Sequence, residues 1–122
     1  MSQKEMINYV ELPAKNIPAT KAFFEHAFSW HFIDYGPEYT AFSHAGIDGG
    51  FFQSNLASST LNGACLLVLL SDNLELTQQR VIKSGGRICQ EIFSFPGGRR
   101  FHFIEPSGNE LAVWSPVKAY IA

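Results

Sequence analysis

Four histidines are the first residues of this sequence to consider for chemistry, because imidazole binds metal ions and exchanges protons near neutral pH. They are His26, His31, His44 and His102. No two of them are spaced two apart on a strand or four apart on a helix, the spacings that bring two ligands to one metal ion. The spacing therefore predicts no chelating pair. We expect His44 and His102 to be the histidines that offer a polar group to a cleft.

Glu11 is the carboxylate of most chemical interest. Residues 6–13 alternate as a strand does, and this places Tyr9 and Glu11 on one face. An inward and buried Glu11 would have a raised pKa and would serve as a hydrogen-bond donor or a base. The alternative is that Glu11 reaches solvent or pairs with a basic side chain, since charged groups avoid full burial.

No nucleophile is marked by its neighbours in the sequence. There is no Gly-x-Ser-x-Gly motif, and neither Cys65 nor Cys89 stands beside a histidine. The run Gly97-Gly98-Arg99-Arg100 has no helix after it, so a hairpin is favoured over a phosphate-binding loop. Two interpretations of Arg99 and Arg100 stay open: they form a solvated pair at a strand edge, or one of them reaches a ligand carboxylate from the rim of a cleft.

An internal repeat predicts the elements that position these residues. An offset of 57 residues, from Asn16 to Asn73, aligns residues 73–77 with residues 16–20 and residues 66–69 with residues 9–12. Both halves therefore have a strand-like run ahead of a helix-like run. A duplicated unit that cannot bury its own apolar face must pack against its copy.

Hydrophobic periodicity and turn residues predict the same order of elements in each half. In the first half we expect a helix capped by Asn16 and strands over residues 6–13, 30–33, 39–44 and 51–54, with a turn at 46–50. In the second we expect a helix capped by Asp72 and Glu75 and ended by Gly85-Gly86, and strands over residues 65–70, 87–95, 99–104 and 110–114.

This order of elements predicts the fold class and the domain organisation. The fold class is α+β, with two βαβββ modules. We expect a single domain over residues 1–122, with a first module at 5–54, a linker at 55–63 and a second module at 64–116.

Composition excludes several classes of function. The chain has 122 residues, of which 46% are hydrophobic and 16% charged, as in a compact globular protein. The net charge is -2 and no basic cluster is longer than Arg99-Arg100, so no nucleic-acid partner is expected. Without a membrane-length apolar stretch or a signal sequence, the chain is predicted to avoid membranes and to be cytoplasmic. Cys65 and Cys89 are expected to be buried, reduced thiols.

Several runs of residues occur in an order that is typical of one superfamily. They are Tyr9-Val10-Glu11-Leu12-Pro13-Ala14, Lys21-Ala22-Phe23-Phe24 ahead of Phe28-Ser29-Trp30, Gly85-Gly86, and Glu105-Pro106-Ser107-Gly108-Asn109-Glu110-Leu111. With them the chain resembles the vicinal oxygen chelate (VOC) superfamily of glyoxalases, bleomycin resistance proteins and extradiol dioxygenases. It departs from the family pattern at Ser29, where glycine is usual, and at Glu105, where aspartate is usual. The resemblance implies that each half is a cupped sheet with a helix behind it and that the two sheets enclose a cleft.

The resemblance also implies where a metal ion would bind. Enzymes of the superfamily hold a divalent metal with His, Glu or Gln side chains on the first and last strands of each half. In this sequence those positions fall at Tyr9, Leu66 and Ala112 and near Gln53. Leucine and alanine cannot bind a metal ion, and tyrosine and glutamine are poor ligands. We therefore expect no metal and no other cofactor.

Strand alternation, combined with the resemblance, predicts an apolar and aromatic cleft. The residues expected to line it and to bind a ligand are Tyr9, Glu11, Phe42, His44, Phe51, Gln53, Leu66, Val68, His102, Ala112 and Trp114, with Glu110 at the mouth. Such a cleft suits a small aromatic or hydrophobic molecule.

Two functions stay open on these grounds. The first is metal-free binding of a small molecule, as in bleomycin resistance proteins. The second is catalysis by a lyase or isomerase related to glyoxalase, with a rebuilt metal site or with Glu11 as acid or base.

Open sheet edges and 11 phenylalanines present more apolar surface than a lone domain hides well, so we expect a homodimer that completes the cleft.

Overall fold

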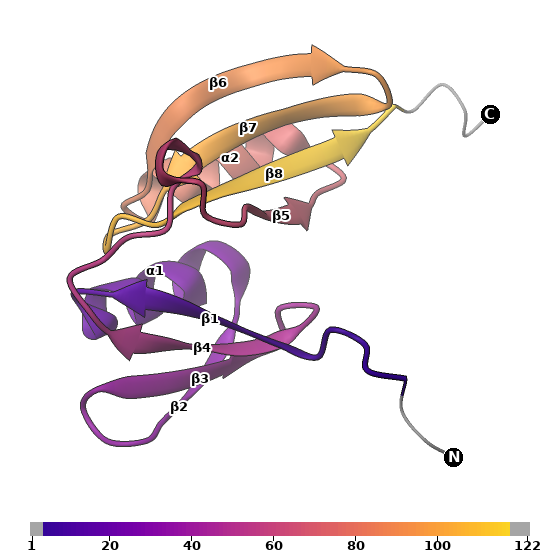
Figure 1. Cartoon of the computed structure of the whole chain (residues 1–122). Helices are drawn as coiled ribbons and strands as arrows, with labels where there is room; N and C mark the ends of the chain where they lie inside the picture. Colours follow the sequence, from indigo (N-terminus) through magenta and orange to yellow (C-terminus); the bar gives the residue numbers. More distant parts are fainter. Residues whose placement is uncertain (1–3, 118–122) are drawn as a thin grey trace.

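The two halves of the sequence form two four-stranded sheets, each with one helix (Figure 1). The computed structural model describes residues 4–117. The first module consists of β1 (Tyr9–Ala14), α1 (Ile17–Phe28), β2 (His31–Asp34), β3 (Tyr39–Ser43) and β4 (Asp48–Gln53). A short 3-10 helix, η1 (Thr60–Asn62), precedes the second module, which consists of β5 (Leu67–Leu70), α2 (Leu74–Lys83), β6 (Arg87–Phe95), β7 (Gly98–Ile104) and β8 (Glu110–Pro116). The predicted α+β fold of two βαβββ units is confirmed.

The two sheets have the same topology. Their strand orders are β1-β4-β3-β2 and β5-β8-β7-β6, with the first pair of each sheet parallel. Glu11 pairs with Gly50 in the first sheet, and Val68 pairs with Ala112 in the second. Because Glu11 and Val68 are related by the 57-residue repeat, Gly50 and Ala112 occupy equivalent positions.

Asparagine caps both helices. The Asn16 side chain accepts a hydrogen bond from the Ala19 N–H at 3.1 Å, and Asn73 accepts one from Leu76 N–H at 3.2 Å. The cap predicted at Asn16 is confirmed, whereas the cap predicted at Asp72 is one residue too early. The repeat locates the second cap better than the local motif does, because Asn16 and Asn73 are equivalent positions.

Strand β4 begins earlier than the sequence indicated. Residues 46–50 were predicted as a turn, but Asp48, Gly49 and Gly50 already pair with β1. The glycines belong to the strand because there is no room for a larger residue: a Cβ on Gly49 would overlap the Val10 carbonyl, and one on Gly50 would overlap Tyr39. The pairing puts Gly50, and not Phe51 or Gln53, on the same side of the sheet as Glu11.

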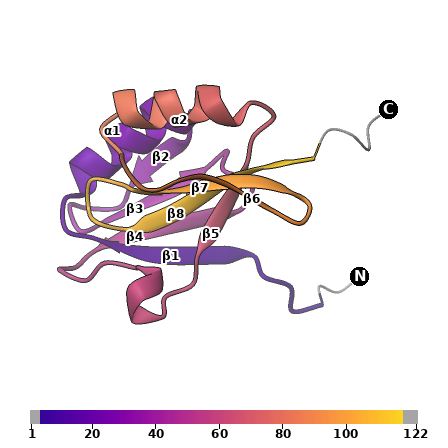
Figure 2. The ribbon, with the colours of Figure 1, turned by 90° about the horizontal axis from the view of Figure 1, so that it is seen from above.

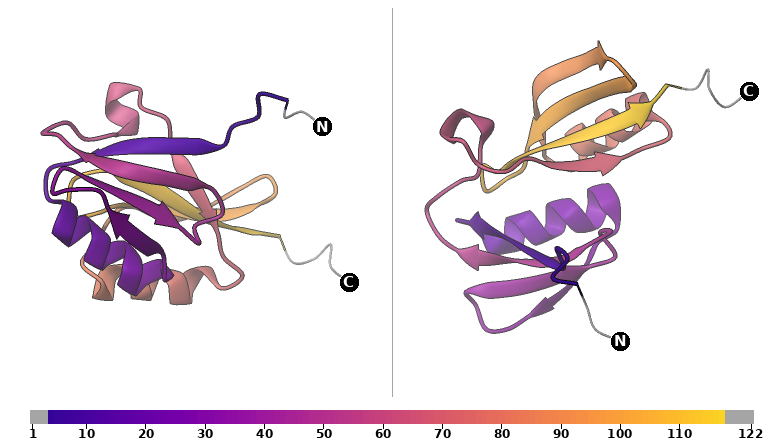
Figure 3. Two further views of the ribbon diagram at one scale, coloured as in Figure 1. Left: turned by 90° about the horizontal axis from the view of Figure 1, so that it is seen from below. Right: turned by 45° about the vertical axis from the view of Figure 1, so that its right-hand side comes forward.

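Helix α1 lies between the two sheets (Figures 1 and 3). The ring of Phe24 is 5.5 Å from that of Phe51 in β4, while the ring of the adjacent Phe23 is 5.6 Å from Phe103 in β7. Figure 2 shows α1 and α2 together on one side of the molecule. The helix-covered faces of both sheets therefore share one core, and the opposite faces, called the cup faces below, are turned outward.

A buried carboxylate joins the two modules. Glu105, 2% exposed, accepts hydrogen bonds from the Thr20 hydroxyl at 2.7 Å and from the Ser107 N–H at 2.9 Å. The Asn109 amide donates to Glu105 as well, and at 2.7 Å to the carbonyl of Pro13. Burial raises the pKa of Glu105 although these hydrogen bonds oppose the shift.

The two cysteines are free and exposed, so the prediction of buried thiols is wrong. Cys65 precedes β5, and Cys89 stands where the pairing of β6 with β7 shifts register between Ile88 and Gln90.

Within residues 4–117, neither helix has the length and apolar character needed to cross a bilayer.

Candidate functional site

The first cup face carries two tyrosines hydrogen-bonded to a carboxylate. The Tyr39 hydroxyl donates to Glu11 Oε2 at 2.9 Å, and the Tyr9 hydroxyl lies 2.6 Å from that of Tyr39. Since the single proton of Tyr39 goes to Glu11, Tyr9 donates to Tyr39. Burial, followed by the hydrogen bonds to Tyr9 and Glu11, raises the pKa of Tyr39. Glu11 itself is exposed, so of the two alternatives for this residue the one in which it reaches solvent holds, and its predicted position beside Tyr9 holds as well.

Gly50 gives Tyr39 the space that it occupies. A Cβ on Gly50 would overlap both the hydroxyl and the ring of Tyr39. As the equivalent of Ala112, Gly50 is the last-strand position of the first module, which the sequence analysis placed near Gln53. That placement is wrong by three residues because β4 starts at Asp48. Gln53 is exposed, and its amide donates to the Lys15 carbonyl at 3.0 Å.

Phe42 and Phe51 belong to the core and not to a cup face. They are 2% and 1% exposed, with ring centroids 5.5 Å apart. Trp30 stacks on Phe42 at 4.6 Å, and Phe51 packs on Phe24 of α1. The prediction that both rings line the cup is wrong because the register of β3 and β4 turns them toward α1.

His44 lies at the rim of the first sheet. It follows β3 with a left-handed backbone (φ 64), which breaks the strand alternation on which its predicted position depended. Its ring stacks on that of His31 at 3.8 Å, and its Nδ1 lies 3.1 Å from the Ser43 hydroxyl. The two rings form an exposed pair at a sheet edge.

The second cup face holds a buried ion pair. His102 Nδ1 lies 2.7 Å from Glu110 Oε2, with side chains 3% and 7% exposed. Burial alone would raise the pKa of Glu110, but hydrogen bonds from His102 and from Thr60 of η1 outweigh it, and the pKa is lowered. The ionised carboxylate accepts, so His102 Nδ1 carries a proton. The prediction of Glu110 at the cleft mouth is wrong because Thr60 covers it, donating from its N–H and hydroxyl at 2.8 Å each.

Two nitrogen atoms on this face are buried without a hydrogen-bond partner in the described part of the chain. They are Nε2 of His102 and Nε of Arg100. The Arg100 guanidinium lies over the rings of Phe93 and Phe95, 5.5 and 5.7 Å from their centroids. The neighbouring Arg99 differs: it forms an ion pair of 2.6 Å with Glu75 of α2. Of the two arginines, Arg100 is therefore the one on the cup face.

The other predicted residues of the second half surround this ion pair. Ala112 is fully buried and lies opposite His102 across the β7–β8 pairing. Val68, 44% exposed, pairs with Ala112 from the edge strand β5. Trp114 is partly exposed, lies opposite Arg100 and is 6.2 Å from the ring of Phe95. Leu66 is half-buried just ahead of β5.

The predicted cleft residues are thus divided between two surfaces. Tyr9 and Glu11 lie on the cup face of the first sheet, whereas His102, Ala112 and Trp114 lie on that of the second. Helix α1 and the shared core separate these faces within one chain (Figure 3). A cleft that uses both faces therefore needs a second copy of the chain.

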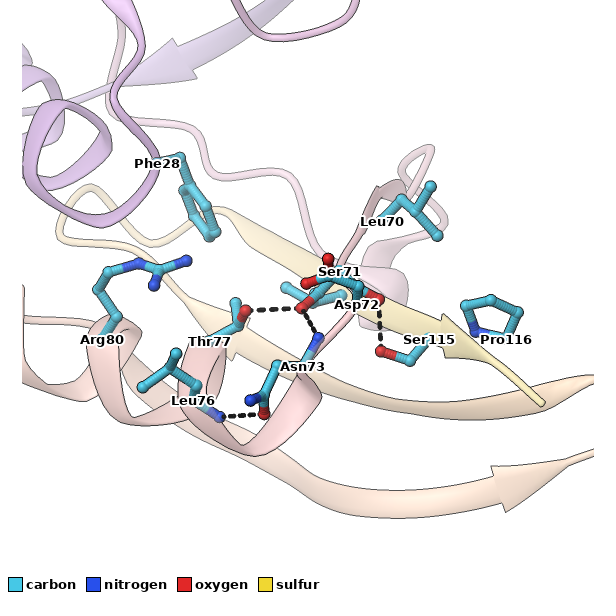
Figure 4. A pocket seen from close by; sticks show the side chains of 11 residues that line it. Phe28, Leu70, Ser71, Asp72, Asn73, Leu76, Thr77, Arg80, Ser115 and Pro116 are labelled. Atoms are coloured by element: carbon cyan, nitrogen blue, oxygen red, sulfur yellow. Dashed lines mark hydrogen bonds between the residues drawn. The ribbon is translucent and has the colours of Figure 1, made fainter. Parts of the chain in front are cut away.

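Two pockets that were not predicted from the sequence lie away from the cup faces. One, of about 490 Å³, lies between Phe28 at the end of α1 and the first turns of α2 (Figure 4). Arg80 closes one end of it and donates from Nε to the Ala27 carbonyl at 2.8 Å. The other, of about 470 Å³, runs between the modules beside Trp30 and Phe42. Their walls come from elements distant in sequence, so no local motif signals them.

The four positions implied for a metal ion do not form a ligand set. They are Tyr9, Gly50, Leu66 and Ala112, which together offer one phenol oxygen. Within residues 4–117, no three His, Cys, Asp or Glu side chains lie close enough to share a metal ion. A divalent metal does not fit these residues.

Comparison with known proteins gives a consistent result. The family model of the Glyoxalase/Bleomycin resistance protein/Dioxygenase superfamily matches residues 6–113. A glyoxalase-related enzyme from Fulvimarina pelagi shares 15% identity and a TM-score of 0.76, over 92% of this chain and 88% of that one. The fosfomycin resistance protein FosX from Listeria monocytogenes shares 14% identity and a TM-score of 0.77, over 94% and 96% of the two chains. No curated protein sequence matches the chain. At these identities the structural likeness concerns the fold.

Proposed function

Because this chain belongs to the glyoxalase, bleomycin resistance protein and dioxygenase superfamily, we propose that it binds a small aromatic or hydrophobic molecule without a metal ion. The observation that carries the proposal is the lack of metal-binding side chains at the four positions where a metal ion would be held. Leu66, Ala112 and Gly50 have no donor atom, and the hydroxyl of Tyr9 is bound to Tyr39. Binding of an apolar molecule needs no such donors.

The chemistry of the two cup faces supports this ligand class. The first face offers the phenol rings of Tyr9 and Tyr39 beside the carboxylate of Glu11. The second offers the rings of Trp114, Phe93 and Phe95. Aromatic rings with a few hydrogen-bonding groups are typical of pockets that take flat, mostly apolar ligands.

We propose that the cleft forms in a homodimer, between the first cup face of one chain and the second cup face of its partner. Each face has exposed apolar side chains in a single chain. Ile33 on the first sheet is 62% exposed, and Leu70 and Val68 on the second are 69% and 44% exposed. A second copy would cover such surface and bring both sets of ligand-binding residues together.

The two free, exposed thiols suit a reducing compartment, and we place the protein in the cytoplasm.

A thermal-shift assay tests the metal-free part of this proposal. Aromatic compounds should raise the melting temperature of the dialysed protein equally with a chelator or with added Ni²⁺, Mn²⁺ or Zn²⁺. Metal analysis after dialysis should find far less than one ion per chain. Near-unit metal content that is lost in the Glu11→Gln variant would contradict the proposal. A monomeric mass by sedimentation at micromolar concentration would contradict the dimer.

A second candidate function is catalysis by a lyase or isomerase, and one observation favours it. The hydroxyls of Tyr9 and Tyr39 form a short path that ends at Glu11, so a proton taken from a bound molecule at Tyr9 has a route to a carboxylate. The glyoxalase-related enzyme among the structural neighbours shows that the fold is compatible with catalysis. Turnover that is lost in both Glu11→Gln and Tyr39→Phe would support this function over simple binding.

A further inference from the structure

We propose that the second cup face recognises the carboxylate of an organic acid, which is held by Arg100 and His102 while its apolar part lies on Trp114. This inference rests on the proposed function, because it specifies the class of small molecule that the same cleft takes. It starts from two buried nitrogen atoms that have no partner.

The two unpartnered atoms belong to one small region. Arg100 and His102 are two residues apart on β7, so their side chains extend from the same face of the sheet. Buried polar atoms in folded proteins nearly always have a hydrogen-bond partner. Arg100 Nε and His102 Nε2 lack one within residues 4–117. Two neighbouring N–H groups of this kind match the two oxygens of a carboxylate when His102 is protonated.

The charges around these atoms favour an anion with a single negative charge. Glu110 is hydrogen-bonded to the other nitrogen of His102 and balances the charge of that ring when it is protonated. Arg100 forms no ion pair with a described carboxylate, and stacking on Phe93 and Phe95 holds its guanidinium in place. In that state of His102, the face has one uncompensated positive charge. A dianion such as phosphate would place its second charge close to Glu110, which a monocarboxylate avoids.

The surroundings of Arg100 supply the apolar half of the site. Trp114 lies directly opposite Arg100 on β8, and Leu70 pairs with Trp114 from β5. An acid group at Arg100 therefore brings the body of the ligand over the indole ring. The side chain next to both polar groups is Phe93. The centroid of its ring is 6.0 Å from that of the His102 ring. Phe93 stands on the edge strand β6, beside a break in the strand register.

A matched pair of ligands tests this inference. Phenylacetate and its neutral amide, phenylacetamide, are titrated into the protein and followed by ligand-observed NMR. We expect phenylacetate to bind about tenfold more tightly than the amide, because its charge-assisted hydrogen bonds are available only to the acid. Arg100→Gln should remove this preference by weakening acid binding more than amide binding, and His102→Gln should reduce it.

Arg99→Gln is the control variant, since Arg99 has the same chemistry but pairs with Glu75 away from the cup face. It should keep the full preference for the acid. Arg100→Lys, which keeps the charge but lacks Nε, should show an intermediate preference and guards against a folding defect in the glutamine variant. Equal binding of acid and amide to the unmodified protein would overturn this inference and leave the proposed function standing. Failure of both compounds to bind would count against both.

Discussion

The two cup faces share one strand frame but hold their polar groups in different ways. On the first face, Glu11 lies on the edge strand β1, is exposed, and accepts a hydrogen bond from a tyrosine hydroxyl. On the second, Glu110 and His102 lie on the inner strands β8 and β7, both are buried, and Thr60 of η1 covers Glu110. A duplicated frame thus fixes backbone register in both halves, while the position of a polar group across the sheet decides whether it meets solvent or is buried.

The largest expected difference between the faces is in stability. Glu110→Ala should lower the free energy of unfolding by about 3 kcal/mol or more, because it leaves buried His102 without its partner. Glu11→Ala should change it by less than about 1 kcal/mol, since an exposed carboxylate is lost. Urea denaturation of both variants measures the difference. Equal losses would mean that the burial of the second face has no energetic consequence.

The equivalent positions Gly50 and Ala112 differ in the room that they leave for a side chain, and this difference can be measured at Gly50. Gly50→Ala should cost about 1–3 kcal/mol, because the added methyl group meets Tyr39. Replacing Tyr39 with alanine in the same chain should recover part of that loss, which a double-mutant cycle in urea would detect. A strictly additive cycle would show that Tyr39 does not occupy the space above Gly50.

The fluorescence of the two tryptophans tests whether a ligand binds at the second cup face or in the core. Trp114→Phe should remove most of the fluorescence change that a bound aromatic ligand causes, whereas Trp30→Phe should not, since Trp30 is 6% exposed and stacked between Phe24 and Phe42. Tyr9→Ala should weaken binding by about 1–2 kcal/mol, the usual loss for an aromatic contact. A response that survives in Trp114→Phe and disappears in Trp30→Phe would move the site to the groove beside Trp30.

The smallest expected effects are in the pH dependence of stability. The pKa of Glu105 is raised above 4.5, so the proton it binds stabilises the fold below that value, and this contribution is lost as pH rises through the folded pKa. The pKa of Glu110 is lowered, so its contribution is present above 4.5 and is lost as pH falls through the folded pKa. On acidification, the stability of the natural protein should therefore rise relative to Glu105→Gln and fall relative to Glu110→Gln. Parallel curves for the two variants would contradict these shifts.

The fold was predictable because its signals are local or repeated. The apolar stripes of both helices, the cap at Asn16 and the 57-residue offset depend on residues close in sequence or on simple alignment. The start of β4 was not predictable in this way. Two glycines after Asp48 are typical of a turn, and only the close approach of β1 and Tyr39 explains why they form a strand.

The candidate site was less accessible to sequence analysis for the same reason. The inward direction of Phe42 and Phe51 follows from the pairing of β3 with β4, and a register error of an odd number of residues reverses the face of each residue. The burial of Glu110 depends on Thr60, which is 50 residues away. Tyr9, Glu11, His102 and Trp114 were placed on cup faces correctly because the strands β1, β7 and β8 alternate without interruption.

The aromatic pair of α1 has a consequence for how the protein evolved. Phe24 serves its own module, whereas Phe23 packs against the second one. In α2 the 57-residue repeat puts Val81 at the position of Phe24 and Arg80 at that of Phe23, and Arg80 reaches back to Ala27 of α1. An ancestor with two identical halves would have had the same residue at both positions. With phenylalanine in one half and arginine in the other, the halves are complementary, and a duplicate of either half in place of the other would lack one of these two contacts.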